Sequence, residues 1–273
     1  MNPISLASGV VPDHGPVDTI LAARAGGFDA VGLWVEPAEW TATTTRDTRA
    51  ALANAGLPLL DVEVIWLKPD DDEALHRKVI DVGAELGAAN VLCVSSHPDP
   101  ATTIASLTRL CRHAEGSGIR VALEFGIFTA VRDLTSALAI LDAVGHPLRA
   151  LLIDPIHVDR SDSSIAAIAK VDPALLPYAQ FCDALAERPD PTDFMAIITD
   201  AIDLRQQCGD GALPLTDLYR ALPDGIPLSI ELRSKQLRDD YPDASARARV
   251  VADATRAWLA RHAQPHLEGT LAR

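Results

Sequence analysis

Three acidic side chains end apolar segments of this sequence. Glu124 ends VALE, Asp154 ends LLID and Glu231 ends LSIE. Burying an ionised carboxylate costs several kcal/mol unless the group is paired or binds a cation. One alternative is that each carboxylate pairs with a basic side chain: Arg160, Arg205, Arg233 or Lys235. Three carboxylates in equivalent positions favour a shared cation site over separate ion pairs.

A fourth oxygen donor, Gln180, lies in the apolar segment AQF. The spacing of about one βα unit from Glu124 to Asp154, and again to Gln180, predicts successive strands. Carboxylate and amide oxygens suit a hard divalent ion, and manganese or magnesium is expected, with cobalt or zinc as alternatives. We therefore predict a metal site made by Glu124, Asp154, Gln180 and Glu231.

Short apolar segments alternate with longer amphipathic ones along the whole chain. The apolar segments predict eight strands, at 4–11, 30–35, 57–67, 90–95, 120–125, 148–153, 178–182 and 226–232. Helices are predicted at 17–25, 43–55, 72–86, 102–114, 134–144, 164–170 and 244–262, with one or two more within 189–222. Nearly continuous apolar strands are typical of strands buried on both faces, and the alternation indicates a parallel sheet.

Eight strand–helix units in 273 residues predict an α/β fold, a single (β/α)₈ TIM barrel spanning residues 1–273. An open doubly wound sheet is the alternative. The first turn, SGVVPDHG, lacks the GxGxxG loop of a dinucleotide site and so disfavours it. Because barrel enzymes work where their strands end, the three carboxylates and Gln180 are expected at one mouth.

Other polar and aromatic residues follow the predicted strands and are candidates for contacting a substrate. They are His157, Arg233, Asp183, Trp34, His97 and Arg205. Three of them also have a purely structural interpretation. Trp34 could pack in the core, His97 lies in the turn-like segment SSHPDP, and Arg205 could be a surface residue at a helix end.

Composition limits the partners and the compartment. The net charge of −14 and the sequence pI of about 4.9 disfavour binding to nucleic acid. The four cysteines form no CxxC pair, which is typical of free thiols in a reducing compartment. No segment approaches about 18 uncharged apolar residues, so a membrane partner is not expected. The sequence predicts a soluble, cytoplasmic protein.

The set formed by Glu124, Asp154 with His157, Gln180 with Asp183, and Glu231 resembles the xylose isomerase-like TIM barrel superfamily, the sugar phosphate isomerase/epimerase family. The resemblance covers nearly the whole chain and is clearest over residues 120–234. It implies that the two glutamates bind the metal and exchange the substrate proton, that Asp154 binds the metal, and that His157 contacts substrate oxygens. One position departs from the pattern. Gln180 stands where a histidine ligand is common, and its carbonyl is a weaker and harder donor than imidazole.

The resemblance implies a metal-dependent isomerase or epimerase of a sugar or small keto-polyol, acting through a metal-stabilised enediolate. Glu124 and Glu231 would be its acid/base pair, and His157 and Arg233 would stabilise the enediolate oxygens. Two alternatives remain: a lyase of the 3-dehydroshikimate or inosose dehydratase type, and a non-catalytic barrel subunit. The acidic charge and the few strand-end histidines disfavour an AP-endonuclease role. The expected partner is a small sugar-like molecule, and the resemblance implies a homodimer.

Overall fold

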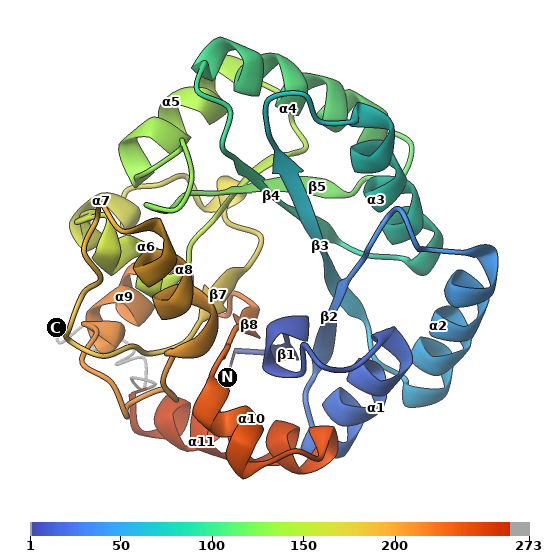
Figure 1. The fold of residues 1–273 in the computed structure, drawn as a ribbon, viewed down its shortest axis with the longest axis vertical. Coiled ribbons are helices and arrows are strands. Elements are labelled where there is room, and N and C mark those ends of the chain that lie inside the picture. Colours follow the sequence, from blue (N-terminus) through green and yellow to red (C-terminus); the bar gives the residue numbers. More distant parts are fainter. Residues whose placement is uncertain (1, 263–273) are drawn as a thin grey trace, which may run out of the picture.

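Parallel strands form the centre of the chain in the computed structural model, which describes residues 2–262 (Figure 1). The strands are β1 Ile4–Leu6, β2 Ala30–Trp34, β3 Leu59–Leu67, β4 Asn90–Ser95, β5 Arg120–Glu124, β6 Arg149–Leu152, β7 Ala179–Phe181 and β8 Leu228–Ile230. Hydrogen-bonded neighbours follow the order β6-β5-β4-β3-β2-β1-β8-β7. Between β6 and β7, the backbone N–H of Gln180 donates to the carbonyl of Ile153 at 2.9 Å. The sheet is therefore a nearly closed barrel, and the prediction of a single (β/α)₈ barrel is confirmed.

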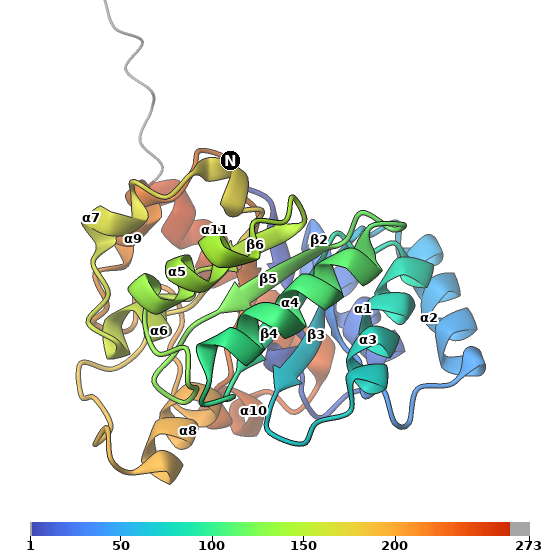
Figure 2. The same cartoon turned by 90° about the horizontal axis from the view of Figure 1, so that it is seen from above.

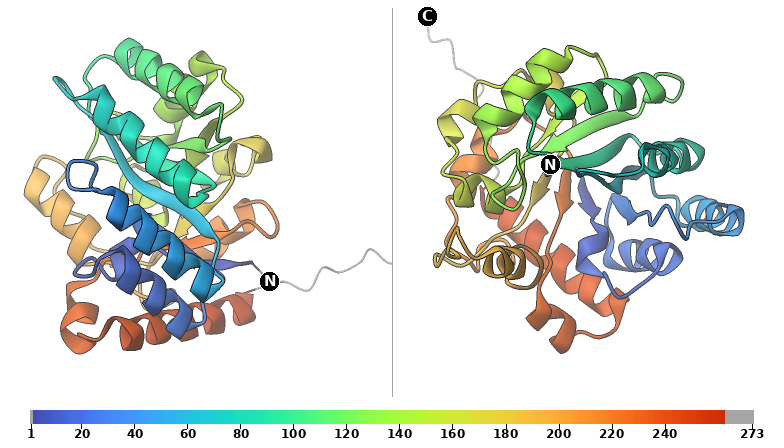
Figure 3. Two further views of the ribbon diagram at one scale, coloured as in Figure 1. Left: turned by 90° about the vertical axis from the view of Figure 1, so that its right-hand side faces the viewer. Right: turned by 45° about the horizontal axis from the view of Figure 1, so that its top comes forward.

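Helices surround the strands, and α1, α2 and α3 lie side by side on the outside (Figure 3, left). The helices are α1 Pro16–Gly26, α2 Ala42–Ala55, α3 Glu73–Leu86, α4 Pro100–Ala114, α5 Leu134–Val144, α6 Pro155–Arg160, α7 Ile165–Ile168, α8 Phe194–Asp203, α9 Leu215–Ala221, α10 Lys235–Asp240 and α11 Ala244–His262, with short 3₁₀ helices η1 Ser8–Val10 and η2 Pro173–Leu175. Local signals set their ends. At the start of α5, Asp133 accepts from the N–H of Ser136, and the helix stops at Gly145 with a φ of 60°.

The structure differs from the expected elements in one strand and in two additional short helices. The predicted strand 4–11 ends early, and its second half forms η1. Helices α6 and α10 were not predicted, because six residues are too few to show a helical repeat. The long segment 189–222 contains α8 and α9, as expected. Helices α8 and α10 lie together at the end of the barrel toward which the strands run (Figure 2).

On the strand faces that carry the polar residues of the site, the preceding positions are apolar. Residues two positions apart in a strand share a face. In β7 and just before it, Tyr178 and Gln180 are such a pair, and in β5 Ala122 shares a face with Glu124. Tyr178 and Ala122 belong to one buried apolar cluster, separate from the larger cluster that includes residues of both helices and strands. The same faces therefore carry apolar residues first and polar ones at the strand ends.

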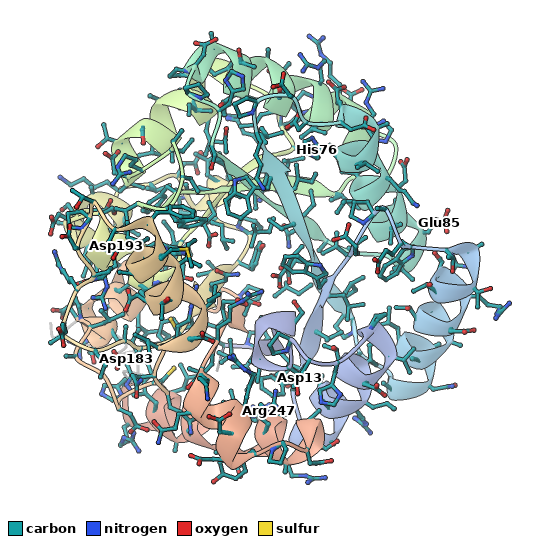
Figure 4. The ribbon with its side chains drawn as sticks, viewed as in Figure 1. Asp13, His76, Glu85, Asp183, Asp193 and Arg247 are labelled. Atoms are coloured by element: carbon teal, nitrogen blue, oxygen red, sulfur yellow. The ribbon has the colours of Figure 1, made fainter. Side chains whose placement is uncertain are left out.

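The loop after η1 is fastened to the last helix by Arg247, whose side chain is fully buried in α11. The guanidinium donates to the carbonyl of Val10 at 3.1 Å and to both carboxylate oxygens of Asp13, at 2.6 and 3.1 Å. Figure 4 shows Arg247 and Asp13 next to each other. Arg247 also donates to the carbonyls of Tyr241 and Pro242, so it joins the end of η1 and the loop that follows to the segment before α11.

Two predictions reach beyond these observations. The single domain predicted for 1–273 includes residues 1 and 263–273, which lie outside the described residues, so that boundary stays a prediction. Within residues 2–262, no helix has the length and apolar character needed to cross a membrane. The cytoplasmic location also stays a prediction.

Candidate functional site

The predicted oxygen donors meet at the mouth of the barrel. Glu124, Gln180 and Glu231 line one cavity of about 140 Å³, and Asp154 lies directly behind Gln180. All four side chains are almost fully buried. The reason is the register of the strands: each residue is at, or just beyond, the end of β5, β6, β7 or β8. Parallel strands of a barrel end at the same rim, so these side chains converge.

Gln180 bridges two of the carboxylates. One terminal atom of its amide lies 2.8 Å from Oε1 of Glu124 and 3.0 Å from Oδ2 of Asp154. With the amide nitrogen at this position, Gln180 donates a hydrogen bond to both carboxylates. With the amide oxygen there, three oxygens would face one another, which requires a cation or a proton between them. A half turn of the amide therefore converts Gln180 from a hydrogen-bond donor into a metal ligand.

Asp154 is held by two kinds of donor. It is the N-cap of α6, where Oδ1 accepts from the N–H of Ile156 at 3.0 Å, and its Oδ2 accepts from Nη1 of Arg205 at 2.6 Å. Burial alone would raise the pKa of Asp154, but Arg205, His157 and the N–H of Ile156 outweigh it and lower that pKa. These donors therefore favour the ionised form of Asp154.

Glu231 has one satisfied and one free oxygen. Its Oε1 accepts from Nε of Arg233 at 2.8 Å. Its Oε2 is buried and has no hydrogen-bond partner among the described residues. A buried carboxylate oxygen without a donor is unfavourable, so this atom is available to a water molecule or a bound cation.

Glu124 and His157 complete the polar cluster. One oxygen of Glu124, one of Asp154 and one ring nitrogen of His157 lie within 4.8 Å of one another, a group that could hold a metal ion. Burial, followed by the charge of Asp154, raises the pKa of Glu124 well above its usual value. Burial lowers the pKa of His157 to about 4, so its imidazole is neutral near pH 7. A neutral imidazole can bind a metal or donate one hydrogen bond.

The charges of the site fit a divalent cation. Four buried carboxylates gather here, because Glu63 of β3 lines the same cavity as Glu124 and Glu231. Two guanidinium groups, Arg205 and Arg233, face them, so these six side chains carry a formal charge of −2 when all four carboxylates are ionised. A divalent ion would balance that charge. Two protons would also balance it, in agreement with the raised pKa values of Glu124 and Glu63, for which burial is the main cause.

One side of the cavity is apolar. Leu92 and Val94 of β4, Trp66 of β3 and Phe128 after β5 line it, and Ile198 and Ile202 of α8 lie at its rim. The ring of Phe128 packs on His157, with 4.8 Å between the ring centroids. Sequence patterns missed Phe128, Ile198 and Ile202. The signal available was the apolar helix FMAIITDAID, which has too few charges for a helix exposed on all sides.

The structure brings some of the predicted substrate-contacting residues to this cavity. Trp34, His157, Arg205 and Arg233 line it. The side chain of Arg205 is buried, and its Nε also donates to the carbonyl of Ala201 at 2.6 Å, so it is a fixed part of the site and no surface residue.

Asp183 and His97 do not line this cavity, so the structure does not bring them together with the other predicted residues. The carboxylate of Asp183 accepts from the backbone N–H groups of Ala184, Gly209 and Leu213 at 2.9 to 3.1 Å, so both oxygens hold the following loop. His97 lines a separate cavity beside α4 and α5, and its Nδ1 accepts from the N–H of Asp99 at 3.2 Å. Both residues follow a strand and so lie near the rim. Their side chains, however, accept hydrogen bonds from backbone N–H groups of the nearby loops.

The sequence also identifies the family. A model of the xylose isomerase-like TIM barrel family matches residues 20–261. The chain belongs to the xylose isomerase-like TIM barrel family. No curated protein matches the sequence.

Solved structures with this fold include three that are informative for this member of the xylose isomerase-like family. The chain resembles an IOLI protein with a bound zinc atom at 16% identity and a TM-score of 0.80, over 95% of this chain and 99% of that one. It resembles a D-allulose 3-epimerase from Methylomonas sp. in complex with D-allulose at 16% identity and a TM-score of 0.70, over 96% and 97% of the two chains. At such identities the likeness shows the fold alone.

The third is a xylose isomerase-like TIM barrel/4-hydroxyphenylpyruvate dioxygenase fusion protein, at 18% identity and a TM-score of 0.78. The match covers 98% of this chain, which spans only 45% of the fusion protein's length. The likeness is therefore to a barrel that forms less than half of that protein.

Proposed function

We propose that the protein is a divalent-metal-dependent enzyme that isomerises or epimerises a sugar or small keto-polyol. The observation that carries the proposal is the free, buried Oε2 of Glu231, in a site whose ionised side chains leave a formal charge of −2. Family membership supports it, as do the neighbouring epimerase and the neighbour with bound zinc. The proposed substrate is small and sugar-like.

Glu124, Asp154 and Glu231 would hold the cation together with the amide oxygen of Gln180, and His157 is close enough to join them. The predominance of oxygen donors favours manganese or magnesium, while the imidazole leaves zinc and cobalt as alternatives. When bound, the metal would polarise a substrate carbonyl and so acidify the neighbouring C–H group.

The protein's own residues would move the proton. Glu231 would take it from the substrate carbon onto a carboxylate oxygen, leaving an enediolate. Glu124 would be the group that returns a proton to carbon. Return to the opposite face of the same carbon gives epimerisation, and return to the neighbouring carbon gives isomerisation. The guanidinium of Arg233 and an N–H of neutral His157 would stabilise the enediolate oxygens.

A lyase that dehydrates a cyclic keto-polyol is the second candidate. The observation in its favour is the apolar wall of Leu92, Val94 and Phe128, which offers no side-chain partner to hydroxyl groups. A ring with one less polar face would lie against such a wall with less desolvation cost than an open-chain polyol. The first step would be the same proton abstraction, followed by loss of a β-hydroxyl group as water.

The test combines metal analysis with proton exchange. We expect the purified protein, after incubation with Mn²⁺ and removal of excess, to hold one ion per chain in elemental analysis. Glu231→Gln should weaken binding by more than the roughly tenfold to hundredfold typical of losing an outer partner. Asp240→Asn, which removes an exposed charge from α10, is the matched control.

Keto-sugars incubated with the loaded protein in D₂O should acquire deuterium next to the carbonyl, seen by NMR, and lose this exchange in Glu231→Gln. Exchange followed by loss of water would select the lyase. A wild-type protein that takes up no Mn²⁺, Mg²⁺, Co²⁺ or Zn²⁺ would refute the proposal and favour a non-catalytic or metal-free barrel.

A further inference from the structure

A second and larger cavity opens beside the catalytic one. It measures about 480 Å³, against about 140 Å³ for the cavity that contains the carboxylates. Ligand sites commonly measure roughly 300 to 1,000 Å³, so the catalytic cavity alone is small for a substrate. Trp34 and Arg233 line both cavities. The two cavities therefore adjoin each other at these two side chains.

The walls of the larger cavity are held in place. They come from the loop between η1 and α1, from the segment between β2 and α2, and from Arg233 after β8. Arg247 fastens the first of these through Val10 and Asp13. In the second, Nε1 of Trp40 donates to Oγ1 of Thr45 at 2.9 Å. The cavity is thus formed before any ligand binds, which reduces the entropy lost on binding.

The chemistry of these walls suits a neutral polyhydroxylated ring. Trp34 is 43% exposed, and its indole offers an apolar face for the C–H groups of a sugar ring. Glu36, Glu39 and Thr44 provide oxygens that can accept hydrogen bonds from hydroxyl groups. The two glutamates disfavour an anionic ligand, because the guanidinium of Arg233 is already paired with Glu231.

We propose that this cavity is a second subsite, which holds a polyhydroxylated ring joined to the keto-polyol that reacts. The substrate is then a glycoside-like compound of two units, with its keto unit at the carboxylates and its second ring stacked on Trp34. The proposal rests on the proposed function, because it assumes that the reacting unit is a keto-polyol.

Binding of two-unit ketoses tests the subsite. Maltulose, lactulose and isomaltulose each join a second sugar ring to a fructose unit, and D-fructose lacks that ring. By isothermal titration of the Mn²⁺-incubated protein, we expect at least one of the three to bind about tenfold more tightly than D-fructose, which corresponds to about 1.4 kcal/mol. Trp34→Ala should abolish this preference. Glu39→Gln, which changes only the larger cavity, should reduce it and leave the affinity for D-fructose unchanged.

Two results would overturn the subsite. In the first, none of the three ketoses binds more tightly than D-fructose. In the second, Trp34→Ala and Glu39→Gln lower the affinities for the two-unit ketoses and for D-fructose by the same factor. Proton exchange in D₂O separates this proposal from the proposed function. Preferential binding of a two-unit ketose without exchange from any ketose would support the subsite and refute the enolising reaction. Exchange from D-fructose without any preference for the larger ketoses would support the reaction and refute the subsite.

Discussion

Asp61 provides a quantitative test of the buried charges in the barrel. It lies in β3 and is completely buried. Its Oδ2 accepts from the hydroxyl group of Tyr178 at 3.3 Å, and its Oδ1 has no partner among the described residues. A Cβ atom on Gly32 would lie 2.6 Å from that Oδ1, so the neighbouring strand has no room for a larger side chain. Asp61→Asn removes the charge and keeps an acceptor for Tyr178.

The expected size of the effect follows from the pKa of Asp61. Burial, and then the charge of Glu231, raises that pKa to about 7 from 3.8. Between these values the folded protein keeps a proton that the unfolded chain releases. The resulting contribution to stability is complete below about pH 4 and is lost as the pH rises through 7. At about 1.4 kcal/mol per pH unit, the loss reaches about 4 kcal/mol.

Urea denaturation of the metal-free protein from pH 5 to pH 9 would measure this loss. EDTA in the buffer excludes cations that would lower the pKa of a nearby carboxyl group. From pH 5 to the pKa of about 7 is two pH units, so the wild-type free energy of unfolding should fall relative to that of Asp61→Asn by about 3 kcal/mol over this range. The exposed Asp240→Asn should follow the wild type. A difference between wild type and Asp61→Asn that does not change with pH would refute the reasoning.

Two further predictions concern the contacts that shape the site. Arg205→Met leaves the buried carboxylate of Asp154 without its guanidinium and should destabilise the metal-free protein by about 3–5 kcal/mol in urea denaturation. Mn²⁺ should reduce this loss, because the cation would also neutralise the carboxylate of Asp154. An equal loss with and without Mn²⁺ would contradict this reasoning. Gly9→Ala places a Cβ atom onto Oε1 of Glu231 and should weaken Mn²⁺ binding in isothermal titration. The control is Gly15→Ala, whose Cβ meets nothing within 4 Å, and similar affinities for the two variants would refute the close approach.

The barrel and the strand-end positions could be predicted from the sequence because both depend on local patterns. Apolar segments separated by helix signals recur eight times, and residues two apart in a strand share a face. This places Glu124, Asp154, Gln180 and Glu231 at one rim without any knowledge of long-range contacts. The short helix α6 was missed, although Asp154 itself begins it as the N-cap.

The partners of those residues were decided by the tertiary structure. Arg205 is 51 residues from Asp154, and it reaches that carboxylate because the loop after α8 pairs with the chain beyond β7 and β8. Asp183 follows a strand as Asp154 does, but it holds the backbone of that same loop. The larger cavity exists because the first two strand–helix loops meet Arg233.

The sequence by itself thus determined the fold and which side chains lie at the mouth of the barrel, since strand periodicity and parallel pairing are repeated in every unit. It did not determine which of them share a proton, a guanidinium group or a cavity. Those relations depend on where the long loops pass over the mouth of the barrel. The path of each loop is set by contacts between residues far apart in the chain.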